Sequence, residues 1–101
     1  MANTKLTREQ KSDLKTFKAV DMPARNIELL NLNNATVMAF ADRGNTVEFS
    51  LAVMSSDEEK FRVKVGEFLA LTRFSEGSTV KMERMDFMFM CETVWGAYPL
   101  L

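Results

Sequence analysis

The chain has 101 residues, of which 47% are hydrophobic and 27% charged, a composition that suits one folded domain with a modest core. Its formal net charge is -1 and its pI about 5.4, so contact with DNA would require positive charge gathered on one surface. The chain contains no histidine, which removes imidazole bases, Ser-His and Cys-His pairs and most zinc sites. We therefore expect a single domain over residues 1–101 that is not an enzyme and holds no metal or other cofactor.

Cysteine, glycine and apolar patterns further restrict the function classes. Cys91 lies in an apolar run and excludes an internal disulfide, which predicts a small buried residue and fits a reducing cytoplasm. Gly44 and Gly77 each stand alone and form no phosphate-cradling loop, so a nucleotide site is not expected. We also expect no small-molecule substrate. The carboxylates at 57–59 lie in a polar stretch that would not raise a pKa. The polar N-terminus and the lack of a long apolar stretch predict no signal peptide and no membrane span.

The first predicted element is an amphipathic helix over residues 5–20, KLTREQKSDLKTFKAV. Leu14 and Phe17 fall on one side of it at helical spacing. Thr7 is a good N-cap, and the glutamine three residues later completes a capping box. We expect the helix to end before Pro23, because proline disfavours helical backbone at the preceding residue.

A basic stripe runs beside the apolar side of this helix. Its members recur at steps of three and four residues and so share one surface: Arg8, Lys11, Lys15 and Lys18. Two interpretations remain open at this point. The four cations either solvate an exposed helix face or meet phosphate groups.

The rest of the chain predicts strands around a second helix. Residues 26–32, 35–41 and 46–53 form an antiparallel meander, in which 46–53 alternates cleanly between apolar and polar side chains. A second helix at 67–74 ends at Gly77, which suits left-handed backbone. The other predicted strands are a short one at 5–6 and longer ones at 61–65, 79–84, 86–92 and 93–101.

The opening helix, the segment FRVKVGEFLALTRFSEGSTVKM and the order of elements resemble one domain of a DNA sliding clamp, the polymerase processivity factor, in its phage form. The resemblance implies an α+β fold with two short helices packed on antiparallel sheets in the order β-α-βββ-β-α-βββ. It also implies that the helices line a central hole and that the sheets form the outer shell. Duplex phosphates would then face Lys11, Lys15 and Lys18, with Arg8 near the helix start and Arg73 on the second helix.

A clamp ring contains six such domains, and this chain has the length of one. The resemblance therefore implies about six copies associating head to tail through edge strands, with a DNA polymerase or other replication protein held on duplex DNA. If the ring does not close, the chain would be a clamp-derived monomer, a dimer or a cap on another clamp.

An apolar run and an apolar tail are candidates for protein contacts. Core packing and partner binding are both open for the run, which includes Met88 and Met90. The tail would dock on its own domain or touch a partner through Tyr98, Pro99 and Leu101. The alternative function is a small interaction protein, with a viral origin as one option, that binds and inhibits a host factor. A cytoplasmic location is expected in either case, in a bacterial host cell if the protein is viral.

Overall fold

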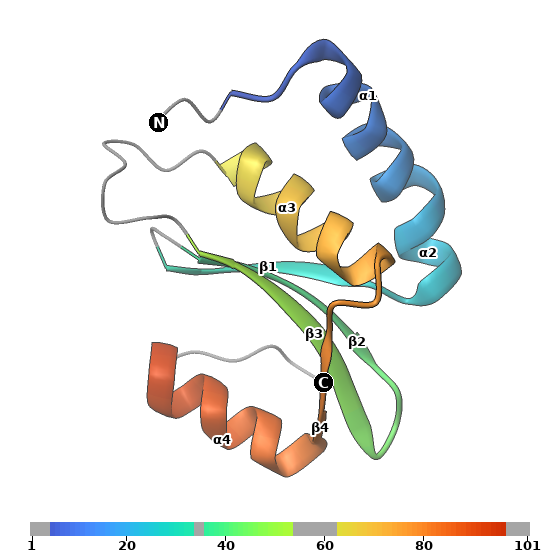
Figure 1. Cartoon of the computed structure of the whole chain (residues 1–101). Coiled ribbons are helices and arrows are strands. Elements are labelled where there is room, and N and C mark those ends of the chain that lie inside the picture. The colour runs from blue at the N-terminus through green and yellow to red at the C-terminus, as the bar shows by residue number, and fades with distance from the viewer. Residues whose placement is uncertain (1–4, 34–35, 54–62, 97–101) are drawn as a thin grey trace.

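In a computed structural model, which describes residues 5–33, 36–53 and 63–96, four antiparallel strands form one sheet with helices on both faces (Figure 1). The spatial order of the strands follows the chain, from β1 (Glu28–Asn33) through β2 (Thr36–Asp42) and β3 (Thr46–Val53) to β4 (Val80–Glu83). These strands lie where the pattern predicted strands over 26–32, 35–41, 46–53 and 79–84. The predicted α+β class, with helices packed on an antiparallel sheet, is confirmed.

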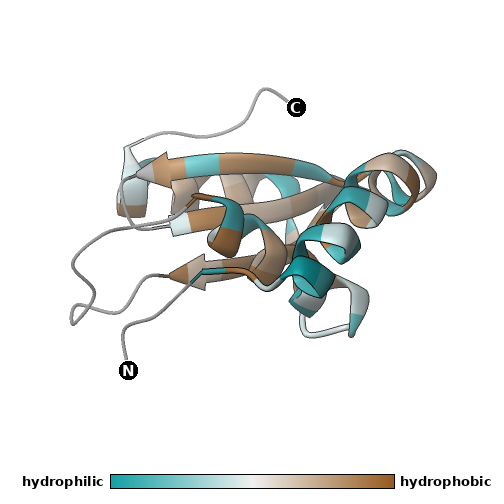
Figure 2. Ribbon diagram, turned by 90° about the horizontal axis from the view of Figure 1, so that it is seen from above, coloured by the Kyte–Doolittle hydropathy of each residue, from teal (hydrophilic) through white to brown (hydrophobic). Residues whose placement is uncertain are grey.

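The two faces of the sheet are covered by different parts of the chain. One face carries a continuous helical segment, which consists of α1 (Arg8–Thr16), the π-helical turn η1 (Phe17–Asp21) and α2 (Met22–Arg25). Beside that segment, α3 (Val63–Ser75) packs on the same face. The other face carries α4 (Arg84–Trp95) alone among the described helices. Figure 2 shows the strands largely in hydrophobic colours and α1 largely in hydrophilic ones.

Two hydrophobic cores result, because side chains of a strand alternate between its faces. Val37 and Ala39 of β2 pack toward α1 and α3, whereas Met38 and Phe40 pack toward α4. β2 is therefore buried on both faces, in agreement with the unbroken apolar run at its residues 37–41. The side with α1 and α3 contains small residues of the sheet, and the side with α4 contains larger ones.

The predicted N-cap of the first helix, Thr7, is confirmed, whereas the helical path starts later than residue 5 and ends later than predicted. Thr7 Oγ1 accepts a hydrogen bond from the Gln10 N–H (3.1 Å), and Gln10 Oε1 accepts one from the Thr7 N–H (2.9 Å). Pro23 does not end the helical path, so that prediction was wrong. The chain widens into η1, where the Met22 N–H bonds to the Phe17 carbonyl, and Pro23 then lies in the first turn of α2. A proline is tolerated there because a first-turn N–H has no helical partner to lose. The path ends at Asn26 in left-handed backbone, with φ 55°.

The second helix is longer than the predicted 67–74. The predicted strand at 61–65 is wrong where it is described, because Val63 opens α3; residues 61–62 lie outside the described ranges. Gly66 does not break the helix but is buried within it. The end of α3 is as predicted. Gly77 has φ 82°, its N–H bonds to the Phe74 carbonyl (3.1 Å), and the Ser78 N–H bonds to the Arg73 carbonyl (2.9 Å).

The last described element is a helix where strands were predicted. The predicted strand at 86–92 and the described part of the one at 93–101 form α4, which ends at Gly96 with φ 68°. Phe87 and Cys91, one helical turn apart, face the sheet, and the Phe87 ring lies 5.3 Å from that of Phe49. The strand prediction failed because this run has no polar alternation, so its period could not separate a buried strand from a helix. Residues 5–6, predicted as a short strand, also lie outside any strand.

Candidate functional site

Three of the predicted cations line one hollow on the helical face of the molecule. Lys11, Lys15 and Lys18 of the first helical segment surround it together with Lys64 of α3. The hollow has a volume of about 210 Å³, and Leu14, which is 5% exposed, supplies its apolar lining. We call this feature, made of these four lysines and Leu14, the lysine groove.

The groove exists because α1 and α3 pack side by side on the sheet. Leu14 belongs to the core beneath them, and the rings of Phe17 and Phe68 lie 6.1 Å apart between the two helical segments. An ion pair of 2.7 Å between Lys18 Nζ and Glu67 Oε1 adds a polar contact at the same junction. The apolar stripe of α1 thus packs the helix against α3. Because the basic stripe lies next to it on the helix surface, its lysines lie at the same junction.

The groove carries an excess of positive charge. Lys11, Lys15 and Lys64 are exposed and form no ion pair with another described residue, whereas Lys18 is partly neutralised by Glu67. The acidic residues of α1, Glu9 and Asp13, project from the opposite flank of the helix at its 100° spacing. Sorting charge in this way gives a local cationic surface to a chain whose net charge is -1.

The other two predicted cations lie outside this hollow. Arg8 is exposed in the first turn of α1 and does not line it. Arg73 lies near the opposite end of α3 from Lys64, where its guanidinium donates a hydrogen bond to the Leu51 carbonyl of β3. Arg73 therefore holds the end of α3 on the sheet.

Sequence reasoning missed Lys64 because it placed this residue in a strand. A usable signal was present in the sequence: Gly66, Ala70 and Phe74 recur every four residues, and all three are buried in the structure. That spacing predicts one buried helix face that begins before Gly66. It would have extended the helix back to Lys64.

The predicted protein-binding residues have mixed surroundings. Met88 and Met90 are both half-buried, and Met90 packs against the core between α4 and the sheet. Tyr98, Pro99 and Leu101 lie outside the described residues. The apolar side chains that α4 exposes most are Met85 and Phe89, which are 83% and 71% exposed.

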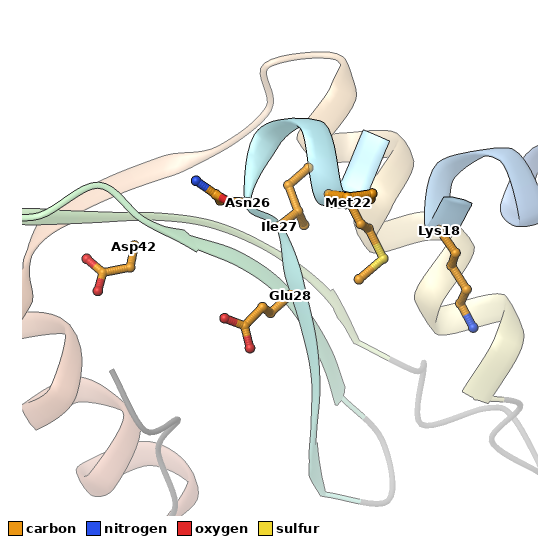
Figure 3. Close-up of a pocket in the computed structure, with 7 residues that line it drawn as sticks. Lys18, Met22, Asn26, Ile27, Glu28 and Asp42 are labelled. Carbon is orange, nitrogen blue, oxygen red and sulfur yellow. The ribbon is translucent and has the colours of Figure 1, made fainter. Parts of the chain in front are cut away.

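A larger hollow of about 510 Å³ lies between η1, α2 and β1 (Figure 3). Lys18 lies at one end, and the carboxylates of Glu28 and Asp42 point to the same side at the other. Lys18 is engaged by Glu67, and Asp42 forms an ion pair of 3.1 Å with Arg84. Because two of its charged groups already have partners, this hollow is less suited than the lysine groove to a charged ligand.

Other kinds of site find little support in the described ranges. No group of three or more histidine, cysteine, aspartate or glutamate residues there could hold a metal ion. Burial raises the pKa of the Cys91 thiol, which keeps it protonated and unreactive. None of the described helices has the length and apolar character needed to cross a membrane.

No protein-family model, curated protein or solved structure matches the chain.

Proposed function

We propose that this protein is a non-enzymatic DNA-binding module that holds the phosphate backbone of duplex DNA in the lysine groove without reading its sequence. The observation that carries the proposal is the set of three exposed lysines without described ion partners around one hollow: Lys11, Lys15 and Lys64. Lysine is a flexible and strongly hydrated point charge, which suits loose contacts with successive phosphates. Such contacts position a protein on DNA and carry no sequence information.

In its full form the proposal is a sliding-clamp-like processivity factor. The arrangement of α1 and α3, side by side on one face of a sheet, supports this reading, because paired helices line the hole of a clamp. The covering of the opposite face by α4 is a departure, since sheets form the outer shell of a clamp. In this form several copies in a reducing cytoplasm close a ring through the sheet edges β1 and β4 and tether a polymerase.

Neutralising the groove lysines tests the DNA contact. We expect the triple variant Lys11→Gln, Lys15→Gln and Lys64→Gln to bind a duplex oligonucleotide more weakly, because it loses three phosphate contacts. Each lost contact should also reduce the slope of log affinity against log salt concentration by about 0.9. With three contacts, wild-type affinity should fall roughly 40-fold as salt rises from about 50 to 200 mM. Fluorescence anisotropy at several salt concentrations measures both quantities.

The matched control for one such replacement is Lys81→Gln. Lys81 is exposed on β4, outside the groove, and the change removes the same charge as Lys15→Gln. We expect Lys15→Gln to weaken binding clearly more than Lys81→Gln does. Equal effects of the two replacements, or unchanged binding by the triple variant, would contradict the proposal.

A second candidate function is an interaction protein that binds and inhibits a host factor. The exposure of Met85 and Phe89 on α4 favours it, because large apolar side chains exposed together commonly mark protein contacts. Light scattering separates the clamp form of the first candidate from this second one. A mass of about six subunits supports the ring, and a monomer at micromolar concentration supports the interaction protein.

A further inference from the structure

The outward face of α4 combines exposed apolar side chains with negative charge. Phe87 and Cys91 face the sheet, so Met85 and Phe89, one turn apart, project away from it. Glu92 follows Phe89 by three residues and Asp86 precedes it by three, so the two carboxylates flank the Phe89 ring. Asp86 and Glu92 are both exposed. We call this set of four residues the α4 knob: Met85, Asp86, Phe89 and Glu92. The one cation of α4, Arg84, is engaged by Asp42.

The lysine groove is complementary to this knob in polarity and charge. The knob has an aromatic ring between carboxylates, and the groove has the apolar Leu14 between ammonium groups. A phenyl ring that enters the groove would contact Leu14 and the lysine methylenes, while Lys ammonium groups gain favourable interactions with its face. The carboxylates of Asp86 and Glu92 would meet the cations at the rim.

The knob and the groove lie on opposite faces of the sheet, so one molecule cannot bring its own pair together. We propose that the α4 knob of one copy docks in the lysine groove of a second copy. The contact is heterologous, because it joins two different surfaces, so it repeats from copy to copy as an open chain or a closed ring. It also hides the lysines of the acceptor copy.

A regulatory consequence rests on the proposed function. If the groove lysines hold DNA phosphates, self-association and DNA binding compete for the same side chains. DNA would then displace the α4 knob from the groove, and knob docking at a high protein concentration would oppose binding to DNA. Self-association itself does not depend on DNA binding and can be tested without it.

Sedimentation velocity of the full chain at rising concentration tests the contact. The wild type should increase in mass with concentration, and added salt should oppose the increase because the rim contacts are ionic. Phe89→Ala should abolish the increase, whereas Val94→Ala, at an α4 residue that is 60% exposed and outside the knob, should not. A wild type that stays monomeric, or equal association by Phe89→Ala, overturns the proposal.

Charge reversal identifies the two surfaces. Lys15→Glu alone and Glu92→Lys alone should each lose association, because like charges then face each other. An equimolar mixture should regain it, since each variant supplies the surface that the other lacks. Lack of recovery in the mixture overturns the proposal, and so does association that depends on Phe89 but not on Lys15, because knobs would then contact knobs.

Duplex DNA in the same experiment separates this inference from the proposed function. Release of associated copies by DNA supports the shared surface. If the wild type associates through Phe89 and Lys15 but binds no DNA, the proposed function fails and the docking contact stands. If DNA binds to the lysines of a protein that never associates, the docking contact fails and the proposed function stands.

Discussion

At the scale of single residues, Glu48 connects three parts of the fold. Its carboxylate accepts hydrogen bonds from Thr79 Oγ1 (2.8 Å) and from the Arg43 guanidinium (3.2 Å). Arg43 in turn donates to the Arg25 carbonyl (2.9 Å) at the end of α2. Burial by itself raises the pKa of Glu48, but these two hydrogen bonds and the charges of Arg43 and Lys81 outweigh it, so the pKa lies below its ordinary value of 4.5.

The lowered pKa predicts how Glu48 contributes to stability across pH. The ionised carboxylate stabilises the fold above its ordinary pKa, and this contribution is lost as pH falls through the lower folded-state pKa. We expect Glu48→Gln to reduce the free energy of unfolding by about 1 kcal/mol near neutral pH, with a difference that shrinks in acid, as the pH falls below 4.5. Urea denaturation at neutral and at acidic pH measures it.

The control for this experiment is Glu76→Gln. Glu76 is exposed and takes no part in the hydrogen bonds of Glu48, so its replacement should change the free energy of unfolding little. If the difference in free energy of unfolding between wild type and Glu48→Gln stays constant from neutral to acidic pH, the ionisation of Glu48 does not contribute to stability.

At the scale of elements, α4 decides which apolar side chains reach the surface. In a strand, Phe87 and Phe89 would point to the same side, because side chains alternate. In the helix they point in different directions. Phe87 is fully buried against Phe40 and Phe49, and Phe89 is 71% exposed.

Two alanine replacements report directly on this element. Phe87→Ala should lower the free energy of unfolding by about 3–5 kcal/mol, because it empties a closely packed position. Phe89→Ala should change it by less than about 0.5 kcal/mol at a concentration where the protein is monomeric. Thermal denaturation compares the two. Similar losses at both positions would argue for a strand here and against α4.

At the scale of the whole molecule, the sheet separates two surfaces of opposite character. The lysine groove lies on the side of α1 and α3, and the acidic α4 knob lies on the other side. The net charge of -1 conceals this division, because it sums the 13 basic and 14 acidic residues of the chain without regard to their positions. A molecule with such faces can attract a polyanion with one side while repelling it with the other.

The clamp form of the proposal predicts a topological effect on DNA retention. A closed ring should stay on a nicked circular duplex at high salt, because a topological link is not weakened by charge screening. The same protein should leave a linear duplex of equal length by sliding from its ends. Gel filtration of both complexes at high salt measures retention. Equal loss from circular and linear DNA would exclude a closed ring and leave backbone binding as the function.

Local sequence signals determined a large part of this structure. The Thr7 capping box, the strand at 46–53 and the left-handed Gly77 were predictable, because each depends on contacts among residues close in the chain. The gathering of Lys11, Lys15 and Lys18 was predictable for the same reason, since helical spacing alone places them on one surface.

Tertiary packing decided the rest. The run at 86–92 carries apolar residues without alternation, so its sequence does not distinguish a strand from a helix. It forms a helix because Phe87 and Cys91, one turn apart, then complete the core between α4 and the sheet. Lys64 joins the groove because α3 packs beside α1, a contact between segments far apart in the sequence. The sequence alone therefore determined that Lys11, Lys15 and Lys18 share a surface, whereas only the tertiary structure placed Lys64 opposite them, because that contact depends on long-range packing.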